Sequence, residues 1–335
     1  MSWLALDIGG ANLKAADGLG FCLSRRFALW KKPEQLAAAL RELIAQAPSC
    51  DHVAATMTGE LADCFATKTD GVRHIVQALS EAASGRHTRI YLLNGTLVAP
   101  PVALHQPLLA AASNWHILAR FAGRFAPQGS ALLLDLGSTT CDLIPLVDGQ
   151  PAAAAQADTE RLLSGELVYS GVERSPACAV APLFPWRGQW CPTVQELFAT
   201  TWDAYLLMGE LPEEPASHHT ADGRPATKAA ARDRLARMIC ADRETFSDED
   251  AAAAASTIAN CQLDLLATAA KKVVERMADP PHTVIVSGQG EFLCRRLAAR
   301  VAPASAIVSL QQKLGPNLSR CAPAHALAVI ARGGK

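Results

Sequence analysis

Short apolar runs alternate with longer segments of helical spacing along most of this chain. A buried run at 3–9 is followed by two strand-like segments at 12–16 and 20–28. Leucines at helical spacing then predict a helix at 34–46, and a second buried strand follows at 52–57. The chain therefore opens with β structure and passes into an alternation of strand and helix.

The same order continues and then begins again. Helices are predicted at 70–84 and 107–121, with a strand at 89–93 between them. Two further strands at 131–136 and 141–147 are separated by a turn rich in small residues, as at the N-terminus. The second half of the chain is thus predicted to contain an internal echo of its beginning.

The segment after this echo is less regular. We expect a helix near 193–208, and a polar stretch at 212–228 without clear periodicity. Within it, residues 218–228 hold cations and a turn, which fits either a lid over an anionic substrate or a solvated surface loop. The remaining predicted elements are helices at 229–240, 249–278, 290–300 and 323–332 and strands at 282–287 and 306–309.

Length and charge narrow the class of protein. A chain of 335 residues, half of them hydrophobic, is long enough for two cores. Its 31 basic and 32 acidic residues nearly cancel, so no overall field favours nucleic acid or an anionic membrane. We therefore expect a small-molecule partner, no nucleic-acid partner and no membrane partner, while the sequence leaves an oligomer open.

Cysteine usage and the N-terminal residues indicate a cytoplasmic protein. The chain starts without a basic segment and has an acidic residue in its first apolar run, which does not fit a secretory signal. No apolar run reaches the roughly 20 residues that span a bilayer. The 10 cysteines are scattered singly and are interpreted as reduced thiols.

The first strand ends in an acidic residue followed by two glycines. Residues 6–14 read Leu-Asp-Ile-Gly-Gly-Ala-Asn-Leu-Lys. Glycines let backbone N–H groups approach an anion closely, and Asp7 can hold Mg²⁺ directly or through water. The alternative is a plain tight turn with an exposed aspartate.

Two later segments strengthen the phosphate interpretation. Residues 134–142 (Leu-Asp-Leu-Gly-Ser-Thr-Thr-Cys-Asp) repeat the order of strand, aspartate, glycine and hydroxyl, which sets Asp135 opposite Asp7 across a cleft. Residues 284–292 (Val-Ile-Val-Ser-Gly-Gln-Gly-Glu-Phe) carry a strand through a Ser-Gly-x-Gly turn into a helix, whose N-terminus accepts a phosphate or ribose. Together the three turns predict a phosphate-binding cleft between two lobes.

This ordered set of three turns resembles the actin, sugar kinase and Hsp70 superfamily, and within it the hydantoinase and oxoprolinase group. The resemblance covers nearly the whole chain and implies a two-lobed, ribonuclease H-like α/β fold with the ligand cleft between the lobes. It places 1–106 and 323–335 in the first lobe and 107–322 in the second.

Three finer segments point to a subgroup. Residues 56–63, 113–116 and 169–176 are similar to a short subgroup linked to tetrahydromethanopterin-dependent one-carbon metabolism. Archaeal members of that subgroup act in methanofuran biosynthesis. The resemblance implies a transferase of methanofuran or methylofuran biosynthesis, which joins an aminomethyl-furanmethyl diphosphate to the phenol oxygen of a γ-glutamyltyramine or tyrosine acceptor and releases diphosphate.

The resemblance also assigns roles to residues. Asp7 and Asp135 are predicted to bind Mg²⁺, with ATP as a further candidate ligand of the cleft. The predicted phosphate-binding residues are Gly9, Gly10, Asn12, Lys14, Gly137, Ser138, Thr139, Ser287, Gly288 and Gly290.

Two residues are predicted to be catalytic. Lys14 is expected to neutralise the departing diphosphate, and Glu60 is a candidate base for the phenol, together with His116 and Glu173. Each of these three has a structural alternative. In these alternatives, Glu60 would cap a local turn and His116 would pack on an apolar helix. Glu173 would pair with the neighbouring Arg174.

Three other functions are compatible with the same fold. An ATP-dependent small-molecule kinase would hold ATP on the same turns and use an aspartate to deprotonate an acceptor hydroxyl. A hydantoinase-like ATP-dependent hydrolase is a second rival. A nucleotide-binding scaffold without catalysis is the third.

Overall fold

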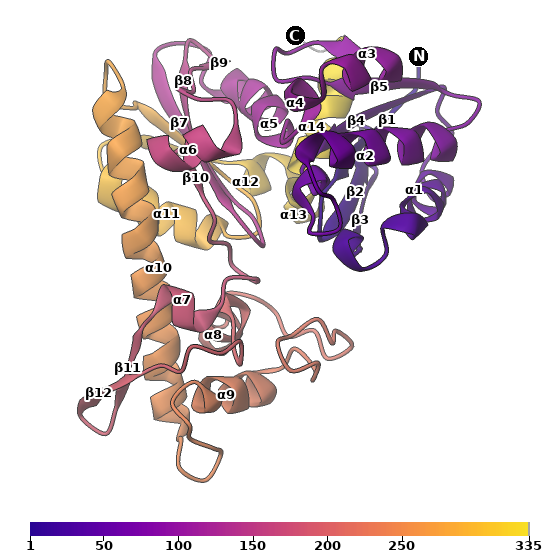
Figure 1. Ribbon diagram of the computed structural model, residues 1–335. Helices are drawn as coiled ribbons and strands as arrows, with labels where there is room; N and C mark the ends of the chain where they lie inside the picture. The colour runs from indigo at the N-terminus through magenta and orange to yellow at the C-terminus, as the bar shows by residue number, and fades with distance from the viewer. Residues whose placement is uncertain (334–335) are drawn as a thin grey trace.

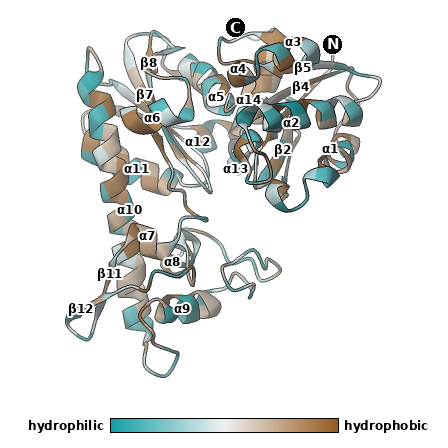
Figure 2. Cartoon of the chain, in the orientation of Figure 1, coloured by the Kyte–Doolittle hydropathy of each residue, from teal (hydrophilic) through white to brown (hydrophobic). Residues whose placement is uncertain are grey.

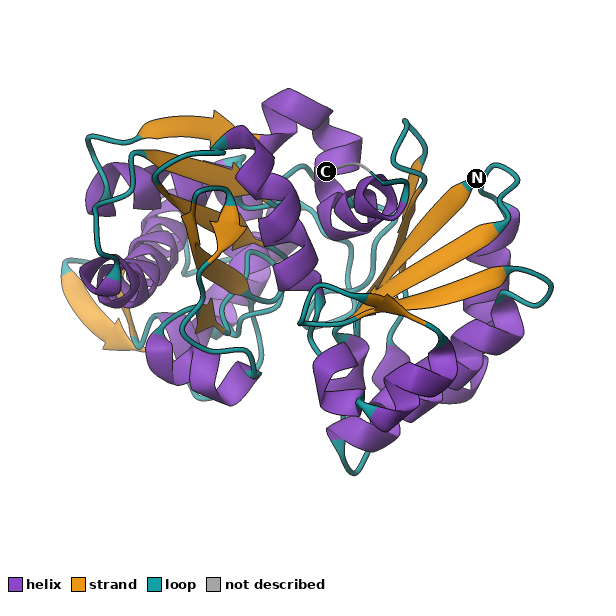
Figure 3. Cartoon of the chain, turned by 90° about the horizontal axis from the view of Figure 1, so that it is seen from above, coloured by secondary structure: helices purple, strands orange, loops and turns teal. Residues whose placement is uncertain are grey.

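Two β-sheets stand on either side of a layer of helices in this protein (Figures 1 and 3). A computed structural model describes residues 1–333. The first sheet contains six strands in the order β3-β2-β1-β4-β5-β6. Its strands are β1 (Trp3–Ile8), β2 (Asn12–Ala16), β3 (Cys22–Arg26), β4 (His52–Met57), β5 (His87–Tyr91) and β6 (Leu97–Val98).

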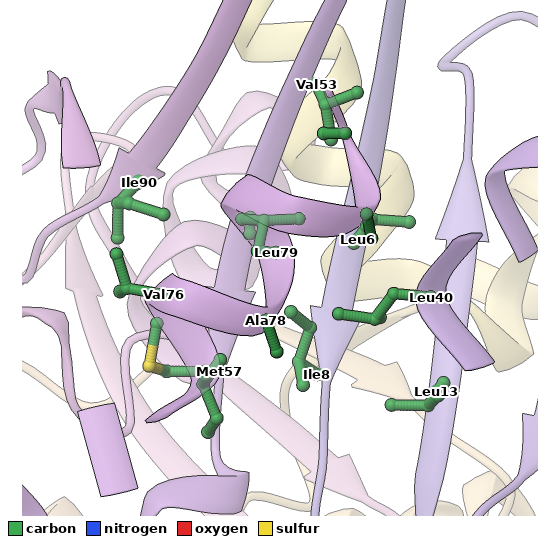
Figure 4. Packing of buried hydrophobic residues seen from close by; sticks show 14 of the residues in the cluster. Leu6, Ile8, Leu13, Leu40, Val53, Met57, Val76, Ala78, Leu79 and Ile90 are labelled. Atoms are coloured by element: carbon green, nitrogen blue, oxygen red, sulfur yellow. The ribbon is translucent and has the colours of Figure 1, made fainter. Parts of the chain in front are cut away.

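Helices cover the outer face of the first sheet. The helices in this part of the chain are α1 (Leu36–Ala45), α2 (Lys68–Ala82), α3 (Pro100–His105), α4 (Pro107–Ala110) and the short 3-10 helices Leu29–Lys31, Pro33–Gln35 and Gly59–Leu61. Figure 4 shows Leu40 of α1 and Leu79 of α2 next to Leu6 and Ile8 of β1. Because side chains alternate along a strand, the Asp7 side chain, between Leu6 and Ile8 on β1, points to the opposite face of the sheet.

The second sheet repeats the topology of the first. Its main strands follow the order β10-β8-β7-β13-β14, and β9 pairs with β8. The strands are β7 (Ser130–Leu136), β8 (Cys141–Val147), β9 (Gln150–Pro151), β10 (Leu167–Val168), β13 (Thr283–Ser287) and β14 (Ala306–Ser309). In both sheets an antiparallel meander continues into parallel strands, so the internal echo and the two-lobed α/β fold are confirmed.

Two helices fill the space between the inner faces of the sheets. They are α5 (Asn114–Ala122) and α14 (Ala322–Ala331), and α14 carries mostly apolar residues (Figure 2). A single buried cluster joins them to Ala5 of β1, Leu133 of β7 and Ile285 of β13. The remaining helices on this side are Gly123–Phe125, α12 (Leu310–Leu314) and α13 (Pro316–Arg320).

The second lobe carries an extension at the lower end of its longest helix (Figure 1). Helices α10 and α11 cover the outer face of the second sheet, and the lower part of α10 packs against the extension. The remaining helices and strands of the second lobe, including those of the extension, are α6 (Asp158–Ser164), α7 (Ala177–Val180), β11 (Leu183–Trp186), β12 (Gln189–Pro192), α8 (Thr201–Met208), α9 (Lys228–Arg237), α10 (Asp248–Arg276) and α11 (Glu291–Val301). A separate buried cluster with Phe184 and Phe246 stabilises this extension.

Two predicted helices are wrong in part. The helix predicted at 107–121 is broken after Ala110, because Ala112 adopts a left-handed φ of 47°. The Ser113 hydroxyl also bonds Thr56 at 2.8 Å, which fixes the break against β4. The helix predicted at 193–208 begins only at Thr201, where Thr200 and Asp203 form a capping box.

The predicted C-terminal helix packs where the two lobes meet. Helix α14 contacts β1, β4 and α5. The predicted first-lobe segment 323–335 includes two residues, 334 and 335, that lie outside the described residues. Among residues 1–333, no helix is long and apolar enough to cross a membrane.

Candidate functional site in the cleft

The first glycine turn, within residues 6–14, places an aspartate and a lysine side by side. Asp7 lies opposite Lys14 in the antiparallel β1–β2 pair, and the lysine Nζ is 3.8 Å from Asp7 Oδ2. Burial raises the pKa of Asp7, and the charge of Lys14 offsets this only in part. The other oxygen, Oδ1, is buried without a hydrogen-bond partner among the described residues. This oxygen is therefore suited to a cation.

Glycine is required in this turn by a close backbone approach. The Gly9 N–H donates to the Asn12 carbonyl at 3.0 Å, and a Cβ at Gly9 would lie 2.9 Å from that oxygen. Gly10 has open space around its Cβ position and lines a cavity. The turn thus leaves room for a ligand to reach its backbone.

The second turn has the same construction with a different charge. Gly137 N–H donates to the Thr140 carbonyl at 2.9 Å, as Gly9 does to Asn12. Asp135 lies opposite Asp142 in the β7–β8 pair, where the first turn has a lysine. Burial, and then the charge of Asp142, raise the pKa of Asp135 to about 6.

A buried arginine balances Asp142. The Arg161 guanidinium donates to Asp142 Oδ1 at 2.7 Å and stacks on the Trp115 ring, with the guanidinium carbon 4.2 Å from the ring centroid. Burial still raises the pKa of Asp142 despite this arginine. This side of the cleft holds two carboxyl groups and one guanidinium, so a cation between the turns would stabilise the ionised form of Asp135.

The segment 169–176 supports the second turn. Val172 N–H donates to the Gly137 carbonyl at 3.0 Å, and Glu173 N–H donates to the Ser138 carbonyl at 3.1 Å. A Cβ at Gly171 would overlap the backbone of Ser138 and Thr139. Segment 169–176 therefore packs on the second glycine turn and supports it.

The third turn packs on the second. Ser287 is the register neighbour of Asp135 in the parallel β7–β13 pair, and the Gly290 N–H donates to the Leu136 carbonyl at 2.9 Å. Gly288 has a φ of 89°, and a Cβ there would overlap the Leu136 carbonyl. Gly288 lines a cavity, whereas Ser287 and Gly290 are absent from the walls of both cavities described next.

Two adjoining cavities occupy the cleft. The first has a volume of about 340 Å³, and the second about 230 Å³. Predicted residues in the wall of the first are Asp7, Gly9, Gly10, Asn12, Lys14, Glu60, Asp135, Gly137, Ser138 and Thr139. The residues shared with the second are Asn12, Lys14, Asp135, Gly137, Ser138 and Pro323. The two glycine turns thus meet where the cavities join.

Glu60 belongs to the first cavity. It follows β4 in the 3-10 turn Gly59–Leu61 and is only 1% exposed. Burial raises its pKa to about 7, and its Oε2 has no hydrogen-bond partner among residues 1–333. The charge of Asp158 adds to the rise in the pKa of Glu60, and the charge of Lys68 opposes it. Asp158 and Lys68 form an ion pair with each other across the lobes at 2.8 Å.

The other two base candidates behave differently. The His116 Nδ1 shares a hydrogen bond with the Tyr91 hydroxyl at 2.8 Å, and burial lowers its pKa to about 4. His116 lines neither cavity, which supports its interpretation as a packing histidine. Glu173 lines the second cavity and accepts from Gln289 at 2.6 Å.

The partner expected for Glu173 is wrong. Glu173 forms an ion pair with Arg26 of β3 at 3.5 Å, while the Arg174 guanidinium stacks 4.7 Å from the Trp30 ring centroid. Both interactions cross from one lobe to the other. The cleft is therefore bridged by side chains from segments far apart in the sequence.

Several cleft residues were not found from the sequence. Asp142 could have been found, because it follows Asp135 by the same seven positions that separate Lys14 from Asp7. Arg161 and Arg26 gave no signal, since their roles depend on contacts outside their own helix or strand. The polar segment 218–228 lines neither cavity, and Asp222 pairs with Arg234 at 3.1 Å, which supports the surface-loop alternative.

The donor set of the cleft fits magnesium. Among residues 1–333, no three or more His, Cys, Asp or Glu side chains lie together as a metal site made of protein ligands alone. Mg²⁺ is commonly held by one or two carboxylates together with waters and substrate phosphates. Asp7, with its buried unpartnered oxygen, and Asp135 provide such a pair between the two glycine turns.

A family model and a well-covered relative match most of this chain. Residues 51–331 match the hydantoinase/oxoprolinase family model. A Methanocaldococcus jannaschii relative is 31% identical over 98% of this chain and 96% of its own length. It is named as the synthase of a furan-2-yl methanamine that carries a (γ-L-glutamylamino)ethyl-phenoxymethyl group.

Two further comparisons give a weaker likeness. A Methanococcus vannielii protein with the same name is 28% identical over 60% of this chain and 90% of its own length. Among solved structures, the inorganic polyphosphate/ATP-glucomannokinase from Arthrobacter sp. strain KM is 15% identical, with a TM-score of 0.43. That comparison covers 100% of this chain and 99% of the kinase.

Proposed function

The chain belongs to the hydantoinase/oxoprolinase family and is an enzyme, and from this premise we propose that it is a transferase that forms an aryl ether. It joins an aminomethyl-furanmethyl diphosphate to the phenol oxygen of a γ-glutamyltyramine or tyrosine acceptor, and diphosphate is released. The step belongs to the biosynthesis of methanofuran or methylofuran. The name of the Methanocaldococcus jannaschii relative supports this proposal, because it describes a phenoxymethyl link between a phenol and a furan methanamine.

One observation supports the proposal most strongly. The first cavity combines two glycine turns and the Asp7–Asp135 pair with the aromatic side chains of Trp30, Trp115 and Tyr169. The turns offer backbone N–H groups and hydroxyls to an anion. The aromatic walls suit the rings of a furan and a phenol. A single cavity is thus equipped for both parts of the reaction.

The proposed reaction exchanges one carbon–oxygen bond for another. The bond between the furanmethyl carbon and the diphosphate oxygen breaks, and the diphosphate leaves with the electron pair. The phenol oxygen forms the new bond to that carbon, and its proton passes to water. The ring stabilises positive charge on the furanmethyl carbon, so the main task of the protein is to stabilise the departing anion.

Residues of both turns contribute to that task. The Lys14 ammonium and the backbone N–H of Gly10 neutralise and orient the departing diphosphate, while the hydroxyls of Ser138 and Thr139 donate to its oxygens. Mg²⁺ held by Asp7 and Asp135 would supply further positive charge at the leaving group. We propose that Glu60, like Lys14, contacts the substrate, because it lines the cavity and its Oε2 has no hydrogen-bond partner among the described residues.

Product analysis by mass spectrometry tests the proposal. Purified protein is incubated with Mg²⁺, γ-glutamyltyramine and the aminomethyl-furanmethyl diphosphate, and in parallel with ATP in place of the diphosphate donor. We expect the ether and diphosphate in equal amounts. Acceptor-dependent ADP formation would establish the kinase instead, ATP-dependent hydrolysis would establish the hydrolase, and no turnover with any substrate would favour the scaffold.

A further inference from the structure

One part of the first cavity is acidic and lies apart from the phosphate turns in sequence. Glu60 and Asp158 line it, one from each lobe. The nearby Lys68 Nζ is engaged with Asp158 at 2.8 Å, and the Arg161 guanidinium is engaged with Asp142. Lys68 thus balances Asp158 and Arg161 balances Asp142, so neither cation forms an ion pair with Glu60.

Glu60 itself lacks a donor on one oxygen. Its side chain is 1% exposed, and Oε2 is buried without a hydrogen-bond partner among the described residues. A buried acceptor without a donor costs about 1–3 kcal/mol, and more if it is charged. A ligand in this cavity can supply the missing donor.

The position of Glu60 is fixed by close packing. A Cβ at Gly71 of α2 would overlap the Glu60 backbone, and a Cβ at Gly59 would lie 2.8 Å from the Leu29 side chain. Thr58 N–H donates to the Ile8 carbonyl at 3.0 Å, which joins this turn to the end of β1. Glu60 is therefore held rigidly at the same edge of the sheet as Asp7.

The missing donor should carry positive charge. Glu60 forms no ion pair with any of the described residues, and burial raises its pKa to about 7, so a cation beside it would stabilise the ionised carboxylate. A primary ammonium offers both a charge and three N–H donors. It would favour the ionised form of Glu60 and satisfy Oε2 together.

We infer that Glu60 binds the primary ammonium of the substrate, which is the aminomethyl group on the furan donor. The identity of the amine rests on the proposed function, whereas the preference for a primary ammonium rests on the cavity alone. Asp7 and Thr56 are register partners on neighbouring strands, and Glu60 follows Thr56 by four residues. The donor thus lies along one sheet edge, with its diphosphate at the first turn and its ammonium at Glu60.

Calorimetric binding of a simple amine tests this inference without any turnover. Furan-2-ylmethanamine is the probe, and 2-ethylfuran is its uncharged counterpart; both are titrated into the full chain with Mg²⁺ at neutral pH. We expect the wild type to bind the amine at least tenfold more tightly than 2-ethylfuran. Glu60→Gln should remove this preference, because the amide carries no charge.

The matched control is Glu81→Gln, the same change at an exposed glutamate of α2 outside both cavities. It should retain the wild-type preference. Equal binding of the two probes by the wild type would overturn the inference, and this comparison needs no variant. Retention of the preference in folded Glu60→Gln protein would also overturn it.

Turnover with two donors separates this inference from the proposed function. With the aminomethyl donor, Glu60→Gln should raise KM about tenfold or more, while a donor with methyl in place of aminomethyl should show little difference between variant and wild type. If Glu60 acts instead as the base for the phenol, Glu60→Gln should lower kcat equally with both donors. That result would contradict the ammonium role. If no donor releases diphosphate, the proposed function fails, and the amine titration still decides the role of Glu60.

Discussion

Asp142 lies directly opposite Asp135 across the β7–β8 pair, at the position that Lys14 takes opposite Asp7 in the first sheet. The two halves of the cleft are therefore built alike but charged differently. In the first half Lys14 pairs with Asp7 and also lines the cavity, while in the second a buried arginine balances the extra carboxylate. Burial raises the pKa of Asp135 to about 6, and the charge of Asp142 adds to this rise.

The first prediction concerns the pH dependence of stability without Mg²⁺. The pKa of Asp135 rises from 3.8 to about 6 in the folded protein, so the folded state holds more protons between these values. The free energy of unfolding must then fall as pH rises through this window. Asp135→Asn removes the fall, so the variant should exceed the wild type by on the order of 1 kcal/mol at pH 7.5 and by much less at pH 3.5.

Urea unfolding at the two pH values measures this difference. The same gap between variant and wild type at pH 3.5 and 7.5 would show that Asp135 titrates alike in both states.

The second prediction concerns the leaving group. Lys14→Met keeps an unbranched side chain, one atom shorter, but removes the ammonium next to Asp7. If Lys14 stabilises the departing diphosphate, kcat should fall by about 10²–10³-fold. Steady-state kinetics would measure this, with Lys31→Met, an exposed lysine outside both cavities, as the control. A kcat within twofold of the wild type would exclude Lys14 from the chemistry.

The third prediction concerns the buried pair that supports the second turn. Arg161→Leu leaves Asp142 buried without its cation, which should lower the free energy of unfolding by about 3–5 kcal/mol. The exposed Arg41–Glu81 pair is the comparison, and Arg41→Leu should cost less than about 1 kcal/mol. Chemical denaturation measures both. Similar small losses would mean that Asp142 is solvated or protonated in the native state.

The fourth prediction concerns a glycine outside the phosphate turns. In Gly171→Ala the new Cβ meets the backbone of Ser138 and Thr139, so the second turn must shift. Activity should fall more than tenfold, because a shift of about 1 Å in a positioning group can cost 10²-fold in rate. Gly20→Ala is the control, since its Cβ position is open and distant from both cavities. An unchanged kcat in Gly171→Ala would show that the turn adapts.

The repeated turns made much of the fold predictable. Asp7 and Asp135 mark equivalent strand ends, and the sheets around them have the same strand order, as the echo in the sequence indicates. The long helices and buried strands also carried clear periodicity. The broken helix at Ala112 was missed because its apolar spacing continues through the break, and only contacts with β4 reveal it.

The candidate site was predictable in its turns but not in its bridges. Asp7, Lys14 and Asp135 belong to local motifs, and a single cavity brings them together. Arg26 meets Glu173, and Lys68 meets Asp158, only because the two lobes face each other. Residues so far apart in sequence share no local pattern, so their pairing required the structure.

Acceptor-dependent release of diphosphate is the measurement that tests the central claim most directly. Wild-type protein, Asp7→Ala and Asp135→Ala are each supplied with Mg²⁺ and the furanmethyl diphosphate, with and without γ-glutamyltyramine, and circular dichroism confirms that each is folded. We predict diphosphate release by the wild type only when the acceptor is present, and a loss of at least 10²-fold in each variant. Full activity in either folded variant, or release that does not depend on the acceptor, would contradict the claim.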